Sequence, residues 1–319
     1  MIFKLAKLSS LSVPFIEIFL GITGLLILFT LVFGLWNKKS PSPGMKEIVV
    51  RIYSWWIILF LIIFVFLLPG DFATIVTAFF TFVALREFLT KLEVTKHFRK
   101  TILYVYLTIP LQFYFAKYGS QHIFNAFIPI YMFFLIAMRN IVLGNYKNYL
   151  EFNGKVFWVL MLIVFGFSQV SFLRHQTIIG GYEGGSELLI LLILFLTQFN
   201  DVLQFLWGKT MGRNKLSPNI SPNKTTEGFL GAAFTLAAIT AGLASYLPFA
   251  SRWEAALFGL LLSTFGLFGD LNMSAVKRDL GVKDMDDLIP GHGGILDRLD
   301  SISFTLPFTV QYLIIRGYL

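Results

Sequence analysis

The 319-residue chain contains no cysteine and little charge, because only 14% of its residues are Asp, Glu, Lys or Arg. The lack of cysteine excludes disulfides, thiolate metal sites and a cysteine nucleophile. Soluble domains carry about 25% charged residues, so low charge combined with 56% hydrophobic residues excludes an ordinary soluble protein. The composition predicts an all-α, polytopic integral membrane helical bundle.

Long apolar runs recur along the whole chain. About 20 residues are needed to cross the ~30 Å hydrocarbon core, and most of the runs approach that length. Pro110 and Pro307 interrupt two of them, so we expect nine to ten transmembrane helices in one membrane domain, residues 1–319. The first run lacks the features of a cleavable secretory signal and is expected to be retained. The ten runs are 13–36, 52–69, 71–90, 102–118, 123–143, 156–173, 188–207, 228–248, 253–273 and 301–316.

The positive charge follows the expected topology. The net charge is +8, and 20 of the 26 Lys and Arg residues lie in five alternate gaps between the runs. The positive-inside rule places these gaps in the cytoplasm and both termini outside. The charge is therefore explained by topology and anionic lipid headgroups rather than by nucleic acid. The five gaps are 37–51, 86–101, 139–155, 208–227 and 274–300.

The last gap, Ser274–Asp300, concentrates ionisable groups between two apolar runs. Ionisable side chains beside membrane segments usually mark a functional site. Carboxylates can hold a divalent ion, cations can neutralise phosphate oxygens, and glycines let a backbone come close. On a helix, Asp270, Ser274 and Lys277 would share one face, whereas Pro290–Gly294 favours a turn. The pattern predicts a site for a metal-bound polyphosphate.

Simpler readings exist for the acidic residues at the end of this gap. Asp297 and Asp300 are expected one helical turn apart, where acidic residues could merely complement a helix dipole. Asp297 and Arg298 could also form a structural ion pair. So many charges beside membrane segments would nevertheless be costly without a ligand, which favours a site for the set as a whole.

A second polar stretch runs from Asn200 to Gly228. Asp201 follows a mostly apolar run and therefore needs a partner. Ser221 or Thr225 can cap the helix that follows, and a helix N-terminus beside Lys224 favours anions. The basic residues alone are equally typical of a loop that obeys the positive-inside rule.

Together these stretches resemble the signature of the phosphatidate cytidylyltransferase (CDP-diacylglycerol synthase) family. The resemblance covers about residues 200–300, within an expected catalytic region 188–319, whereas residues 1–187 match only in hydropathy. Asp286 departs from the family, which usually has Gly, Ser or Ala there. The matching residues are Asp201, Gly208-Lys209, Ser221-Pro222, Lys224-Thr225 and Glu227-Gly228 upstream, then Ser274, Lys277-Arg278, Lys283-Asp284, Pro290, His292-Gly293-Gly294, Asp297-Arg298 and Asp300.

The resemblance implies transfer of CMP from CTP to phosphatidate, giving CDP-diacylglycerol and pyrophosphate. It implies a two-metal site with Mg²⁺, whose second ion could be monovalent, and Asp270 and Asp297 as the main ligands. The residues implied as metal ligands are Asp270, Asp297, Asp201 and Asp300. The implied catalytic residues are Lys224, Lys277, Arg278, His292 and Arg298. The implied substrate-binding residues are Lys209, Ser221, Thr225, Ser274, Lys283, Gly293 and Gly294.

The partners implied are CTP, phosphatidate or a similar lipid phosphate, and membrane lipids, and a homodimer is compatible with the sequence. We expect the protein in a bacterial inner membrane with its site facing the cytoplasm. His292 could transfer a proton or only position the backbone. The acceptor pocket is expected in the first six apolar runs.

Two alternatives remain open at this stage. One is a related CTP-using enzyme whose acceptor is a polyprenol or an ether lipid. The other is a catalytically silent paralogue, or a transporter, that uses the charges to bind ions or lipid. The first six apolar runs are expected to hold almost no buried charge, which disfavours a translocation path.

Overall fold

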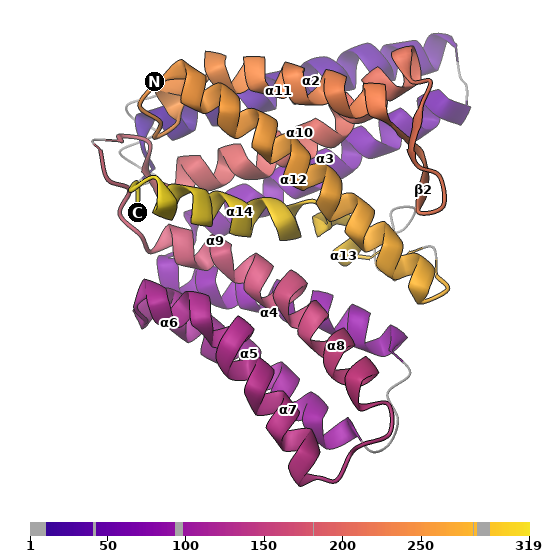
Figure 1. Ribbon diagram of the computed structural model, residues 1–319. Helices are drawn as coiled ribbons and strands as arrows, with labels where there is room; N and C mark the ends of the chain where they lie inside the picture. The colour runs from indigo at the N-terminus through magenta and orange to yellow at the C-terminus, as the bar shows by residue number, and fades with distance from the viewer. Residues whose placement is uncertain (1–10, 41–42, 93–97, 181, 283, 286–293) are drawn as a thin grey trace.

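The computed structural model describes residues 11–40, 43–92, 98–180, 182–282, 284–285 and 294–319, and most of them are helical (Figure 1). Three helical stretches include a π-helical or 3₁₀ turn. The elements are α2 (Val13–Lys39), α3 (Pro43–Leu67), α4 (Gly70–Lys91), α5 (Arg99–Tyr118), α6 (Gln121–Ala126), η2 (Phe127–Met132), α7 (Phe133–Val142), α8 (Tyr149–Val159), η3 (Leu160–Phe165), α9 (Gly166–Arg174), α10 (Gly185–Met211), β1 (Lys215–Ser217), β2 (Ser221–Thr225), α11 (Thr226–Gly242), η4 (Ala244–Tyr246), α12 (Arg252–Asp279), α13 (Leu296–Leu299) and α14 (Ile302–Ile315).

The structure supports the prediction of an all-α integral membrane bundle. Each of the ten apolar runs is helical, and the helices α5 and α14 continue through Pro110 and Pro307. The predicted number of nine to ten membrane-spanning helices is not confirmed, because six described helices are long and apolar enough to cross a membrane. Those six are Val13–Lys39, Gly70–Lys91, Gln121–Val142, Tyr149–Arg174, Gly185–Met211 and Arg252–Asp279.

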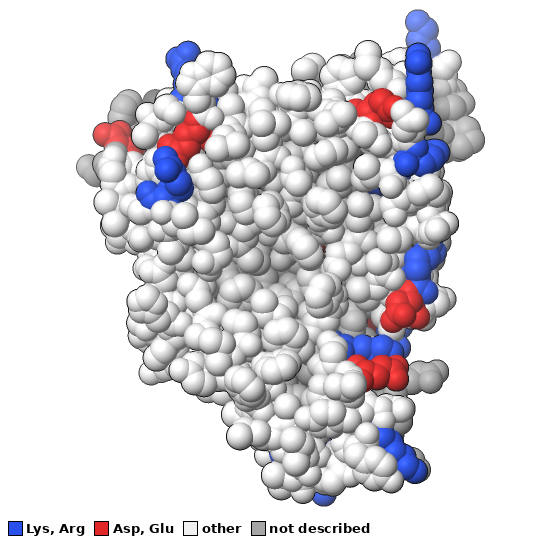
Figure 2. Space-filling view, in the orientation of Figure 1, with Lys and Arg blue, Asp and Glu red and all other residues white. Residues whose placement is uncertain are grey.

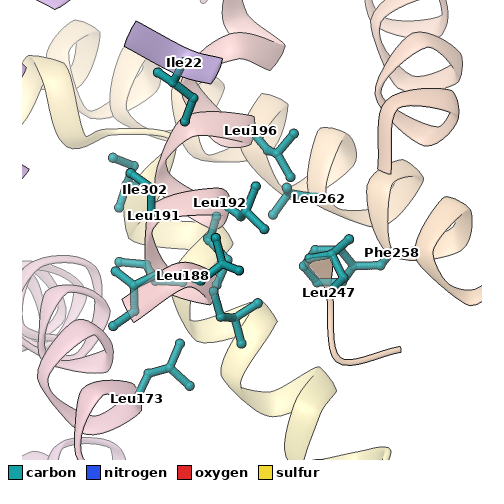
Figure 3. Packing of buried hydrophobic residues seen from close by; sticks show 14 of the residues in the cluster. Ile22, Leu173, Leu188, Leu191, Leu192, Leu196, Leu247, Phe258, Leu262 and Ile302 are labelled. Atoms are coloured by element: carbon teal, nitrogen blue, oxygen red, sulfur yellow. The ribbon is translucent and has the colours of Figure 1, made fainter. Parts of the chain in front are cut away.

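The helices pack as two connected groups. In one group α10, α11, α12 and α14 pack against one another, with α2 beside α3 and α10 (Figure 1). In the other group α4, α5 and η3 pack against α9, which also contacts α14 and thereby joins the groups. Helix α10 is central because leucines such as Leu188, Leu192 and Leu196 lie among Phe258 and Leu262 of α12 (Figure 3). This core holds the helices that carry the polar residues considered below.

A two-stranded antiparallel hairpin is the only sheet among the described residues. Strands β1 and β2 pair Lys215 with Thr225 and Ser217 with Ser221. The connecting residues Pro218 and Asn219 are typical of a turn. The hairpin is a small exception to the all-α prediction, and it places Lys224 directly before α11.

The described parts of three basic gaps, 37–51, 208–227 and 274–300, lie at the same end of the bundle, which we call the basic end. The end of α2, the β1–β2 hairpin and the end of α12 all lie on the right in Figure 1. In the same orientation, Lys and Arg side chains gather along that edge (Figure 2). The opposite end holds the start of α12 and the end of α14. Sequence and structure thus agree on which segments share an end, while the compartment that the basic end faces stays a prediction.

Candidate active site

Helix α12 brings the first group of predicted residues to the basic end. Asp270, Ser274 and Lys277 all lie within this helix, which confirms that they share one helical stretch. Ser274 Oγ lies 3.4 Å from Asp270 Oδ1, as expected for neighbours four residues apart on one face. The helix therefore presents a carboxylate, a hydroxyl and an ammonium group in a single row.

Lys224 links three elements of the bundle. Its Nζ lies 2.6 Å from Asp270 Oδ2 on α12 and 3.8 Å from Asp201 Oδ1 on α10. It also donates a hydrogen bond to Gln204 Oε1 on α10 at 2.8 Å. Burial disfavours the charged form of Lys224, but the carboxylates of Asp201 and Asp270 outweigh burial and raise its pKa above the ordinary value. Lys224 is therefore a cation fixed between two aspartates.

Asp300 completes what we call the carboxylate cluster, which consists of Asp201, Asp270 and Asp300 around Lys224. Burial, and then the charges of Asp270 and Asp201, raise the pKa of Asp300 well above its ordinary value. A Cβ on residue Gly269 would lie 2.9 Å from the carbonyl oxygen of Asp300, so only glycine allows this close approach. Three carboxyl groups thus compete for one lysine, and this crowding disfavours the ionised form of Asp300.

Asp297 forms a separate and more completely satisfied contact. Its Oδ1 lies 2.9 Å from Lys277 Nζ, and its Oδ2 accepts the backbone N–H groups of Met285 at 2.8 Å and Gly294 at 3.0 Å. The structure therefore pairs Asp297 with Lys277. The side chain of Arg298 is not among those that the structure describes, so its predicted ion pair with Asp297 stays a prediction. That Asp270 and Asp297 are the main metal ligands stays a prediction, and the structure places each beside a different lysine.

The donor set of the carboxylate cluster fits a divalent cation. Mg²⁺ binds carboxylate oxygens and retains several waters, so it needs few protein ligands. Asp201 Oδ1 is buried and accepts no hydrogen bond within the part of the chain that the structure describes. No ready-made shell of three acidic or histidine ligands occurs among the described residues, and the ammonium group of Lys224 contacts both Asp201 and Asp270. The cluster is thus suited to a cation without being closed around one.

The upstream loop is held by close packing around Thr225. The Thr225 hydroxyl caps α11 by accepting the N–H of Gly228 at 3.1 Å. A Cβ on residue Gly228 would lie 2.8 Å from the carbonyl oxygen of Gln204 and 2.9 Å from Thr225 Oγ1. The glycine therefore lets α11 begin directly against α10, which sets Lys224 beside Gln204. Thr225 is buried in this packing, and its predicted contact with substrate is untested.

Glu227 stabilises the same loop, a role that the sequence did not reveal. Its carboxylate accepts the backbone N–H groups of Arg213 at 3.0 Å and Asn214 at 3.1 Å. These bonds, the one from Arg213 foremost, lower the pKa of Glu227 to about 2. It is therefore ionised across the physiological pH range. An acidic residue in the first turn of a predicted helix was the available signal.

Glu87 on α4 is the most informative residue that the sequence reasoning missed. Its side chain is buried, and its two oxygens accept the N–H groups of Ile295 at 2.9 Å and Leu296 at 3.0 Å. These N–H groups begin α13, the short helix that carries Asp297. Glu87 is therefore an exception to the expectation of almost no buried charge in the first six apolar runs. A carboxylate near the end of an apolar run was the signal.

The remaining predicted residues are distributed around these contacts. Lys209 and Arg278 are exposed at the basic end, and Lys209 lies 5.8 Å from the ring centroid of Phe205. Ser221 begins β2 opposite Ser217. The structure thus joins Lys224, Asp201, Asp270, Asp300 and Ser274 in one group and Lys277, Asp297 and Gly294 in another. Lys283, His292 and Gly293 lie outside the described residues.

Comparison with known proteins identifies the family of the chain. Residues 49–315 match the model of the cytidylyltransferase family. The fold and the charged site define a membrane nucleotidyltransferase, and the chain belongs to the cytidylyltransferase family. The match begins in α3, so it extends well beyond the 200–300 stretch that carries the motifs.

Two kinds of relative are similar to the chain. Over 291 residues it is 37% identical to the uncharacterized protein YnbB of Escherichia coli (strain K12), covering 91% of this chain and 95% of that protein. Over 179 residues it is 40% identical to the phosphatidate cytidylyltransferase of Staphylococcus aureus (strain COL). The second alignment covers 54% of this chain and 65% of that enzyme, which is less than two thirds of its length. The activity of that enzyme is therefore only proposed for this chain.

Proposed function

We propose that the protein transfers CMP from CTP to phosphatidate, releasing CDP-diacylglycerol and pyrophosphate. The observation that carries the proposal is the pair of lysines, Lys224 and Lys277, held by aspartates of α10, α12 and α13 at one end of a membrane bundle. Cations held in this way suit the phosphate groups of a nucleotide and a lipid headgroup. The cytidylyltransferase relatives support CTP as the nucleotide.

The reaction needs charge neutralisation more than proton transfer. The phosphate monoester of phosphatidate is already ionised near pH 7, so it can attack the α-phosphorus of CTP without a strong base. A new P–O bond forms to the lipid phosphate while the bond from the α-phosphorus to the bridging oxygen breaks. Pyrophosphate leaves with that electron pair. Lys224 and Lys277 reduce the repulsion between the two anions by contacting their oxygens.

The carboxylates have two tasks in this proposal. They orient Lys224 and Lys277, and Asp201, Asp270 and Asp300 would hold Mg²⁺. When bound, the ion supplies positive charge for the phosphates and for the leaving pyrophosphate. Asp297 is proposed to contribute to a second metal position, monovalent or divalent. Arg278, Arg298 and His292 remain proposed catalytic residues.

The proposed setting is a bacterial inner membrane with the basic end toward the cytoplasm, because CTP is found there. The chain would act on lipid in its own membrane, as a monomer or a homodimer. A related acceptor such as a polyprenol or ether lipid phosphate is the second candidate. The alignment with the phosphatidate cytidylyltransferase covers only 54% of this chain, which leaves room for a different acceptor.

The test is a direct assay of the purified full chain in detergent. The protein is incubated with Mg²⁺, labelled CTP and a panel of lipid phosphates and lipid alcohols, and the lipid product is separated by chromatography. We expect labelled CDP-diacylglycerol with phosphatidate, and formation at least about 10²-fold slower with Asp270→Asn. Product with another acceptor alone would replace the substrate, and no lipid product with any acceptor would favour a silent paralogue.

A further inference from the structure

An apolar groove of about 270 Å³ lies between the two groups of helices. Its walls come from α3, α4, α9, α10 and the α13–α14 segment, with Ile22 of α2 at its margin. Most of the lining side chains are apolar, and they include Phe66, Phe80 and Phe195. A groove of this composition inside a membrane protein suits a hydrocarbon chain.

The groove begins beside the candidate active site. Ile295, the residue before α13, and Leu299, the last residue of α13, both line it, and their spacing of four residues places them on one face of this turn. Asp297 lies between them in sequence and contacts Lys277 of α12. The short helix therefore separates an apolar chamber from the lysine and carboxylate groups. An amphiphile could place its phosphate on one side of α13 and its chain on the other.

The wall formed by α4 is apolar although it contains threonines. Thr77 Oγ1 donates to the carbonyl oxygen of Ala73 at 2.8 Å, and Thr81 Oγ1 donates to that of Thr77 at 2.9 Å. Because the hydroxyl groups are bonded to their own helix, the methyl groups remain to line the groove. Ala73, Thr77 and Thr81 are also small, which leaves space opposite the larger residues of α3 and α10.

Arg174 at the end of α9 lines the groove near the end of α3. Its guanidinium group donates to the carbonyl oxygens of Val65 at 2.9 Å and Leu68 at 2.8 Å, near the end of α3. Along α3 the lining runs from Trp55 to Phe66, a rise of roughly 17 Å at 1.5 Å per residue. The groove thus extends along α3, with the candidate active site near one end and Arg174 near the other.

We infer that this groove binds an acyl chain of the lipid acceptor and that Thr77 limits the chain length it accepts. The inference rests on the proposed function. We assign the groove to an acyl chain of the acceptor because it begins beside the residues proposed to bind the lipid phosphate. A boundary phospholipid could supply the same hydrocarbon, so the experiment must separate the two sources.

The first measurement is acceptor preference. Thr77→Phe fills the middle of the groove, so we expect the ratio of kcat/KM for dioleoyl over dihexanoyl phosphatidate to fall about 10-fold. The matched control is Ile75→Phe, because Ile75 is on the same helix, 63% exposed and outside the groove. This control should keep the ratio within about two-fold of the parent. An unchanged ratio in Thr77→Phe would overturn the inference.

The second measurement does not need turnover. A phosphatidate with a photoreactive group near the end of its acyl chain is cross-linked to the full chain, and labelled peptides are mapped by mass spectrometry. We expect labels at Thr77 and Leu191 that excess phosphatidate removes and phosphatidylcholine does not. Labels confined to outward residues such as Ile75 and Phe79, or equal competition by both lipids, would contradict the assignment.

The two measurements distinguish this inference from the proposed function. Groove labelling without any CDP-lipid product would reject the proposed reaction and retain the acyl-chain site. Product formation without groove labelling would retain the proposed reaction and reject the acyl-chain site. If a second copy of the chain fills the groove instead, Thr77→Phe would change the mass measured by light scattering and leave chain preference unchanged, which would also overturn the inference.

Discussion

Charged side chains occur at both ends of the bundle, but they are arranged differently. At the opposite end, Glu254 accepts hydrogen bonds from Arg316 Nε at 2.7 Å, Tyr318 Oη at 2.9 Å and the backbone N–H of Ala250 at 3.2 Å. At the basic end, the carboxylate cluster shares Lys224. A carboxylate whose hydrogen bonds are all made, such as Glu254, stabilises the packing of the segments around it. The carboxylate cluster has more carboxyl groups than cations, so it can bind a cationic ligand.

The same contrast appears in how the contacts connect the chain. Glu254 joins the start of α12 to the C-terminal residues. Asp201, Lys224, Asp270 and Asp300 come from α10, β2, α12 and the α13–α14 junction. A functional site built from four elements must be positioned by packing, which explains the close glycine contacts at this end.

The largest expected difference between the ends is the side of the membrane that they face. Because the chain lacks cysteine, single cysteines can be placed at two exposed positions, Asn219 at the basic end and Ala250 at the opposite end. In intact cells an impermeant maleimide should label Ala250→Cys and leave Asn219→Cys unlabelled until the cells are permeabilised. Labelling of Asn219→Cys from outside would reverse the orientation and separate the site from CTP.

Removal of one carboxylate at the basic end should affect turnover most. Asp270→Asn and Asp297→Asn should each lower kcat by at least about 10²-fold, comparable to the loss of a major electrostatic stabiliser. Chelation of divalent metal with EDTA should abolish the activity of the parent. The comparison variant is Glu254→Gln, which should remain within about two-fold of the parent. Near-normal turnover of either aspartate variant in excess Mg²⁺ would remove that residue from the site.

The lysines should show a smaller but clear effect. Lys→Met keeps the aliphatic stem and removes the charge, and a hydrogen bond to a charged group contributes about 1.5–3 kcal/mol. Lys224→Met and Lys277→Met should therefore lower kcat/KM by about 10- to 100-fold. Lys38→Met, in the last turn of α2 at the same end, should change it little. Equal effects at all three positions would mean that the lysines only set the orientation of the helices in the membrane and do not contact the substrates.

Glu87 should behave as a positioning residue, because it touches the start of α13 rather than the lysines. Glu87→Gln replaces one accepting oxygen by an NH₂ group that cannot accept the N–H groups of Ile295 and Leu296. We expect kcat to fall by about five- to tenfold and the Mg²⁺ concentration for half-maximal activity to rise. Glu87→Asp keeps the charge. This variant should therefore have a kcat and a Mg²⁺ dependence between those of Glu87→Gln and the parent. A lower thermal midpoint with unchanged Mg²⁺ dependence would instead indicate a purely structural role.

The smallest effect is expected at the opposite end. Arg316 is about half exposed, and exposed ion pairs contribute little to stability. Arg316→Gln should lower the thermal midpoint of the detergent-solubilised protein by roughly 1–2 °C and leave kcat within about two-fold of the parent. A loss of activity as large as that of Lys224→Met would show that the two ends are not functionally distinct.

Much of the architecture could be predicted from the chain alone, because bilayer thickness dictates the length of apolar helices. The ten apolar runs are helical, the described parts of three basic gaps share one end, and Asp270, Ser274 and Lys277 lie on one helix, as predicted. The number of helices that cross the membrane remains a prediction, because several are short or carry polar groups. The hairpin before α11 was missed because its two strands are short and weakly patterned.

The sequence by itself determined the membrane environment, the helical class and the two polar stretches that carry the site, since composition and local spacing encode these features. Only the tertiary structure decided which charges meet: Lys224 with Asp270, Lys277 with Asp297, and Glu87 with the start of α13. These partners are separated by 20 to 208 positions in the chain. Ion pairing depends on distance in space, and that distance is set by helix packing and by close glycine contacts that no local pattern encodes.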